Sequence, residues 1–90
     1  MTHWRLEKSG ARFRELSPAV QAKFDQFQDE IHNNGTHPRE AAEYARCDGF
    51  EELSGGLWSV RLSQGDRVYF KVHEGTGTVE IVEVGGHKKS

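Results

Sequence analysis

The sequence predicts an α+β domain in which a short N-terminal strand and two helices accompany a small antiparallel sheet, with both helices packed on one face. Two patterns carry this prediction: a helical apolar stripe within residues 17–35, and three alternating runs between residues 57 and 84. Ninety residues allow one domain, residues 1–90, with one modest core. The short first strand is expected at residues 3–7, where polar and apolar side chains alternate.

The clearest helix begins at Ser17-Pro18, because serine caps free backbone N–H groups and proline fits the first helical position. Asn33-Asn34-Gly35 ends it, with glycine able to adopt the left-handed cap conformation. Apolar residues recur between these ends at helical spacing and form a stripe that we assign to the core: Val20, Phe24, Phe27 and Ile31. Phe13 and Leu16, three positions apart, predict an earlier helix within residues 11–16 that packs antiparallel to this one.

Residues 36–49 allow two interpretations. Pro38 followed by residues 39–45 is compatible with two helical turns. The same segment is equally compatible with a loop that lies over the sheet, and both alternatives stay open.

Three strands are predicted over residues 57–62, 67–73 and 78–84, where side chains alternate between apolar and polar. Glycine-containing turns at residues 63–66 and 74–77 join them. The inward set is Trp58, Val60 and Leu62, then Val68, Phe70 and Val72, then Val79 and Ile81. The helical stripe would cover this apolar face, which leaves the other face with Arg61, Arg67, Tyr69 and Lys71.

The composition argues against several classes of protein. A formal net charge of −2 argues against broad electrostatic capture of nucleic acid, so any such chemistry would come from a local patch. A single cysteine, Cys47, has no partner for an internal disulfide, which favours a reducing cytosol. No apolar run approaches the roughly 18 residues of a membrane span, so no membrane association is expected. The five histidines lack paired spacing, and we predict neither a metal site nor a cofactor.

The polar face carries groups that metal-independent RNA cleavage needs. A base takes the 2′ proton, an acid protonates the leaving 5′ oxygen, and positive charge stabilises the phosphorane between them. Glu51 would be the base, and His87 the acid because imidazole titrates near neutrality. Arg61 and Arg67 would hold the phosphate. By composition alone, an ordinary solvated face is the favoured interpretation of these residues, and catalysis is the lesser one.

Three segments resemble the RelE/ParE superfamily of bacterial toxins. Residues 50–62 contain a glutamate, a leucine, a glycine turn and then the strand Trp-Ser-Val-Arg, similar to the family pattern Trp-Ser-x-Arg. Residues 66–72 resemble the next strand, which opens on Arg67, and residues 82–87 resemble the last strand with its terminal His87. The likeness is greatest to the YoeB-like mRNA interferases, and the order of strand, two helices and meander is similar too.

This resemblance implies a RelE-like fold and the toxin of a type II toxin–antitoxin system, a cytoplasmic endoribonuclease that cleaves ribosome-bound mRNA through the 2′-hydroxyl. It assigns the base to Glu51, the phosphate contact to Arg67 and the acid to His87. The remaining RNA-binding residues are expected to be Arg61, Tyr69, Lys71 and Lys88. The implied partners are a cognate antitoxin protein and RNA.

The sequence also allows three other interpretations of its function. A ParE-like toxin would poison a protein target such as gyrase, but that branch lacks the base–acid pair that Glu51 and His87 would form. A related toxin domain would cleave tRNA without the ribosome. A non-catalytic relative is favoured by the ending Lys88-Lys89-Ser90, since YoeB-like proteins usually end with an aromatic residue after the histidine.

Overall fold

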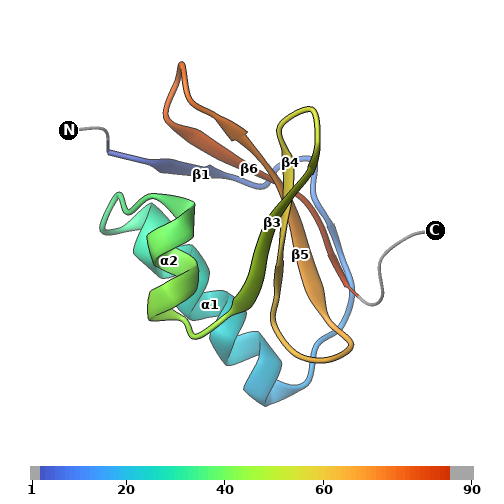
Figure 1. The fold of residues 1–90 in the computed structure, drawn as a ribbon. Helices are drawn as coiled ribbons and strands as arrows, with labels where there is room; N and C mark the ends of the chain where they lie inside the picture. The colour runs from blue at the N-terminus through green and yellow to red at the C-terminus, as the bar shows by residue number, and fades with distance from the viewer. Residues whose placement is uncertain (1–2, 86–90) are drawn as a thin grey trace.

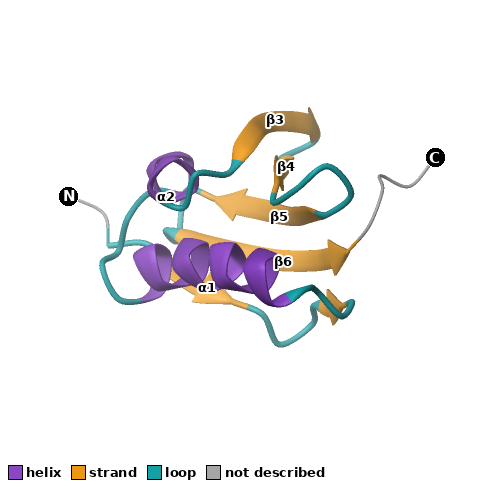
Figure 2. Ribbon diagram, turned by 90° about the horizontal axis from the view of Figure 1, so that it is seen from below, coloured by secondary structure: helices purple, strands orange, loops and turns teal. Residues whose placement is uncertain are grey.

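Six strands and two helices make up the part of the chain that the computed structural model describes, residues 3–85 (Figure 1). Both helices lie on one face of the sheet, so the domain has two layers (Figure 2). The predicted α+β class with two helices against a sheet is therefore confirmed. The elements are β1 (Arg5–Glu7), β2 (Arg12–Phe13), α1 (Pro18–His32), α2 (Pro38–Tyr44), β3 (Asp48–Ser54), β4 (Leu57–Arg61), β5 (Arg67–His73) and β6 (Thr78–Gly85).

The sheet is mixed, so the prediction of a purely antiparallel sheet was wrong. Strands β3 to β6 form an antiparallel meander, in the spatial order β1-β6-β5-β4-β3. Strand β1 and the two-residue strand β2 both pair with β6 in the parallel direction. Parallel pairing is possible here because the two helices and three strands lie between β2 and β6 along the chain, so no hairpin fixes the direction.

The prediction of a helix within residues 11–16 was also wrong, since Arg12 and Phe13 form β2 instead. They pair with Glu83 and Val84 of β6, and the Arg14 N–H donates to the Val84 carbonyl at 2.9 Å. A six-residue segment is too short for a stable helix by itself. The neighbouring strand offers it backbone partners instead.

The second helix is α2, which confirms the helical alternative for the segment after Pro38. His37 caps it, because its Nδ1 accepts a hydrogen bond from the Arg39 N–H at 3.0 Å. Helix α1 confirms its predicted ends. The Ser17 hydroxyl accepts from the Val20 N–H at 3.4 Å, and Gly35 adopts a left-handed φ of 67°.

The core lies between the helices and the inner face of the meander. The predicted inward alternation is confirmed, and its central members are no more than 1% exposed: Val60, Leu62, Val68, Phe70, Val79 and Ile81. Phe27 of α1 contacts Phe70 with ring centroids 5.6 Å apart, which joins the helix layer to the centre of the sheet. Trp58 is half-buried and packs against Phe50, with centroids 4.9 Å apart.

Strand β3 is a fourth meander strand that the sequence reading missed. Glu51 was expected in a loop before the first alternating run, but it lies inside β3. Two register shifts interrupt the pairing of β3 with β4, and apolar residues occur in β3 only at Phe50 and Leu53. Such an edge strand lacks the regular alternation by which strands are recognised in a sequence.

Candidate functional site

One row of residues crosses the outer face of the sheet, the face away from the helices. The strand register pairs Glu51 of β3 with Ser59 of β4, Ser59 with Tyr69 of β5, and Tyr69 with Glu83 of β6. Residues directly opposite each other on adjacent strands hold their Cβ atoms about 5 Å apart. The row therefore places two hydroxyl groups side by side between two carboxylates.

A cleft of about 330 Å³ includes this row and extends beyond it in both directions along the strands. On one side it is lined by Arg67, which precedes Tyr69 by two positions on β5. On the other side the lining is apolar and consists of Leu53, Leu57 and Val82. The cleft thus runs from a cationic end, across hydroxyls and carboxylates, to an apolar end.

The two hydroxyls of the row are buried and have no hydrogen-bond partner within residues 3–85. Ser59 is 1% exposed and Tyr69 is 9% exposed. An unpaired buried hydroxyl costs about 1–3 kcal/mol. Native proteins contain few such groups, so each of them calls for an explanation.

Burial raises the pKa of Tyr69 above its ordinary value of 10.0. The positive charge of Arg67 acts in the opposite direction, and the negative charge of Glu83 acts in the same direction as burial. The phenol therefore stays protonated at neutral pH and remains able to donate a hydrogen bond.

A β-bulge in β6 brings Glu83 to this face. Tyr69 pairs with Glu83, and the next residue of β5 pairs with Ile81, so the register skips Val82. Val82 is the extra residue, and it lines the cleft beside Glu83. Ile81 and Val84 are both buried although they are three positions apart, which strict alternation would not allow.

The cleft brings together part of the predicted site. Glu51 and Arg67 come from different strands and line the same cleft, together with Tyr69. The Glu51 side chain is exposed, so it keeps contact with water. His87 and Lys88 lie outside the residues that the structure describes.

The structure places two other predicted residues away from the cleft. Arg61 forms an ion pair with Asp48, with 3.0 Å between Nε and Oδ1, and lines a separate hollow with Lys23. Lys71 is exposed on β5, and its register partners are Leu57 and Glu80.

Sequence reasoning missed Ser59 and Glu83 as members of the site. Ser59 is one of the outward residues of its strand, so the face on which it lies could be predicted. Its burial could not, because an outward serine is normally exposed to solvent. Its burial depends on the side chains of neighbouring strands. Glu83 reaches the cleft only because of the bulge at Val82.

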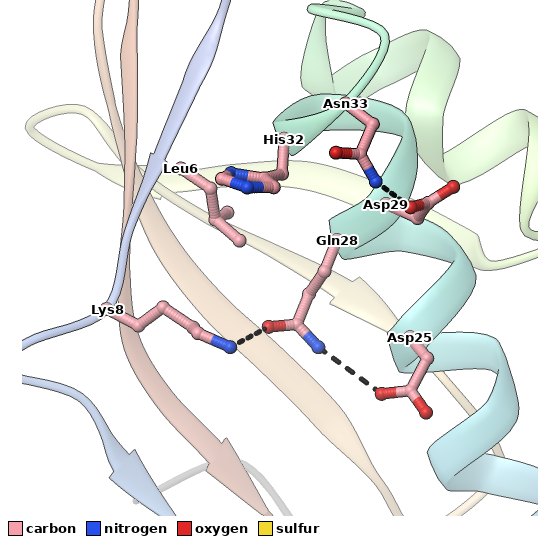
Figure 3. Close-up of a pocket in the computed structure, with 7 residues that line it drawn as sticks. All are labelled: Leu6, Lys8, Asp25, Gln28, Asp29, His32 and Asn33. Carbon is pink, nitrogen blue, oxygen red and sulfur yellow. Dashed lines mark hydrogen bonds between the residues drawn. The ribbon is translucent and has the colours of Figure 1, made fainter.

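A second hollow, of about 320 Å³, lies between β1 and α1 (Figure 3). Its polar side chains bind one another: the Lys8 ammonium donates to Gln28 at 2.8 Å, and the Gln28 amide donates to Asp25 at 3.5 Å. The Asn33 amide donates to Asp29 in the same way. Neither of the unpaired buried hydroxyls of residues 3–85 lies here, so this hollow is the weaker candidate. The full lining is Leu6, Lys8, Asp25, Gln28, Asp29, His32 and Asn33.

Residues 3–85 contain no cluster of three or more histidine, cysteine, aspartate or glutamate side chains placed to hold a metal ion. Neither helix in that part of the chain has the length and apolar character needed to cross a membrane. No known family model and no curated protein sequence matches the chain. The geometry of the outer-face cleft is therefore what identifies it as the candidate site.

Proposed function

We propose that this protein is a RelE/ParE-type toxin of a type II toxin–antitoxin pair, and that it is an endoribonuclease that cleaves ribosome-bound mRNA without a metal ion. One observation carries the proposal: Glu51 and Arg67, from separate strands, line a single cleft on the outer face of the sheet. A carboxylate and a guanidinium at one site supply a base and a charge that stabilises a phosphorane.

The order of elements supports the same proposal. An N-terminal strand region, two helices and a C-terminal meander follow one another along the chain, as the resemblance to the toxin superfamily implies. The segment similar to the Trp-Ser-x-Arg pattern is strand β4, at the centre of the meander. The cleft lies over this strand and its neighbours.

In the proposed reaction, the Glu51 carboxylate takes the proton of the 2′-hydroxyl, which then attacks the adjacent phosphorus. The 2′ oxygen forms a bond to phosphorus, the bond to the 5′ oxygen breaks, and the products carry a 2′,3′-cyclic phosphate and a 5′-hydroxyl. Arg67 stabilises the extra negative charge on the phosphorane. The proton for the 5′ oxygen comes from His87, a role that rests on the resemblance. Gly85 pairs with Arg67, so β6 reaches the cationic end of the cleft two positions before this histidine.

The proposed partners are a cognate antitoxin protein and RNA, and the proposed location is the cytoplasm. An antitoxin that inhibits the nuclease by occupying its site would cover the outer face of the sheet. The formal net charge of −2, and the two carboxylates among the residues that line the cleft, mean that attraction to RNA phosphate comes from Arg67 rather than from the whole surface.

Cleavage of mRNA on translating ribosomes tests the proposal, with the full chain and with EDTA present. We expect wild-type protein to produce 2′,3′-cyclic phosphate ends, and Glu51→Gln to lower the rate by about 10²–10⁴-fold, as is typical for loss of a general base. Glu52→Gln is the matched control. Glu52 lies next to Glu51 on β3 but does not line the cleft, and it accepts a hydrogen bond from the Gly56 N–H at 3.3 Å.

Two results would contradict the proposal. One is wild-type protein that leaves ribosome-bound mRNA intact while still arresting growth when its synthesis is induced in bacteria, which would favour a toxin that poisons a protein. The other is equal cleavage by wild-type protein and the Glu51→Gln variant.

A further inference from the structure

The proposed reaction uses Glu51 and Arg67 but gives no role to the two buried hydroxyls that belong to the same cleft. Ser59 Oγ and Tyr69 Oη have no hydrogen-bond partner among residues 3–85. Alanine and phenylalanine would fill the same positions without an unpaired polar atom, and the sheet would lose no hydrogen bond. A purely structural role therefore does not account for these hydroxyls.

The order of groups along the cleft matches the parts of one nucleotide. The guanidinium of Arg67 suits a phosphate, and the carboxylate of Glu51 suits a ribose hydroxyl. The apolar end, formed by Leu53, Leu57 and Val82, suits the face of a base. A volume of about 330 Å³ lies at the lower end of the range for small-molecule sites, roughly 300–1,000 Å³.

The strand register assigns each hydroxyl a neighbour. Ser59 is directly opposite Glu51, the proposed base for the 2′-hydroxyl. Tyr69 is directly opposite Glu83 of β6 and follows Arg67 by two positions on its own strand, so both of these charges act on its phenol. Ser59 is therefore next to the proposed ribose-binding carboxylate, and Tyr69 lies on the strand that carries the proposed phosphate-binding arginine.

We propose that the cleft binds one nucleotide of the RNA lengthwise and that Ser59 and Tyr69 position it: Ser59 Oγ donates to the 2′ oxygen, and Tyr69 Oη donates to a non-bridging phosphate oxygen. This assignment rests on the proposed nuclease function, because that function makes RNA the ligand. Both oxygens lack contact with solvent in this structure. The side chains around them, including the exposed Glu51, therefore move apart when the nucleotide binds.

The two positioning residues differ from structural ones in a measurable way. Tyr69→Phe and Ser59→Ala each remove an unpaired buried oxygen, so the free energy of unfolding should stay the same or rise. The same variants should each lose about ten- to hundredfold in kcat for mRNA cleavage, because one hydrogen bond to the reacting sugar–phosphate is absent. A structural role would lower stability and activity together.

Matched controls exist in the chain for both changes. Tyr44→Phe makes the same chemical change at an exposed tyrosine of α2, outside the cleft. Ser63→Ala removes a serine hydroxyl in the turn after β4, where it donates to Asp66 at 2.7 Å. Both controls should cleave mRNA at the wild-type rate.

The experiment measures kcat and KM for cleavage of mRNA on translating ribosomes, and thermal unfolding of each variant. Wild-type kcat for Tyr69→Phe and Ser59→Ala overturns the positioning role and leaves the nuclease proposal intact. A fall in stability that parallels the fall in rate overturns it as well, because the hydroxyls would then be structural. Absence of cleavage by wild-type protein is a failure of the nuclease proposal itself, and the two failures are thereby distinguished.

Discussion

Replacing Arg67 with alanine should lower the rate of mRNA cleavage by about 10²–10³-fold, which is the usual effect of losing one group that stabilises transition-state charge. The free energy of unfolding should change little, by less than about 1 kcal/mol. Arg67 begins strand β5 and is half-buried, and its cross-strand partner is Arg61. Like charges directly opposite each other destabilise a sheet, so relief of that repulsion offsets the packing lost with the arginine stem.

Arg61→Ala is the matched comparison, since it removes the other arginine of the same cross-strand pair. Arg61 is turned to Asp48, with side-chain exposures of 41% and 76%, and it does not line the cleft. Loss of such an exposed ion pair costs about 0.2–1 kcal/mol. Cleavage by this variant should stay near the wild-type rate.

The assay follows mRNA cleavage on translating ribosomes, beside urea unfolding of each variant. Equal loss of cleavage in the two arginine variants would refute the reasoning, because only one of these side chains lines the cleft. Full cleavage by the Arg67→Ala variant would remove the phosphate-stabilising role from this residue.

Two further predictions concern stability. Phe70→Ala should lower the free energy of unfolding by about 3–5 kcal/mol, because Phe70 is fully buried at the centre of the sheet. Trp58→Ala should lower it by less, because Trp58 is half-buried. Urea unfolding measures both variants, and a larger loss of stability in Trp58→Ala would contradict this prediction. Stability should also fall at alkaline pH: the pKa of Tyr69 is raised above 10.0, so above about pH 10 the unfolded chain releases a proton that the native state still holds. Tyr69→Phe should make this decline in stability less steep when thermal unfolding is followed between about pH 8 and pH 11. Burial also raises the pKa of the Cys47 thiol above 9.0, so its part of the decline should be present in both proteins.

The helix α1 and strands β4 and β5 could be predicted because local patterns determine them. Ser17-Pro18, the apolar stripe and Gly35 mark the ends and the buried face of α1 without reference to the rest of the chain. Strands β2 and β3 could not be predicted in this way. They are edge strands whose few apolar residues show no period, and they form because a neighbouring strand supplies hydrogen bonds.

The candidate site was predictable only where a residue's face follows from alternation. Arg67 and Tyr69 lie on the outward phase of β5, and both line the cleft. Arg61 lies on the same outward phase of β4, yet its side chain is drawn to Asp48 across the register. The face of a strand residue is a local property, but the direction of a long side chain depends on partners that are distant in the sequence.

The bulge in β6 shows where a sequence does carry a signal that simple alternation overlooks. Residues 79–84 read Val-Glu-Ile-Val-Glu-Val, in which the apolar positions change phase between Ile81 and Val82. Without a bulge, continuing the phase of Ile81 would bury Glu83 and expose Val84, at a large cost in desolvation. One extra residue at Val82 resolves the conflict, and the same step places a carboxylate and an apolar side chain at the cleft. A change of phase within a strand is therefore a reason to look for a bulge, and here the bulge helps to form the candidate site.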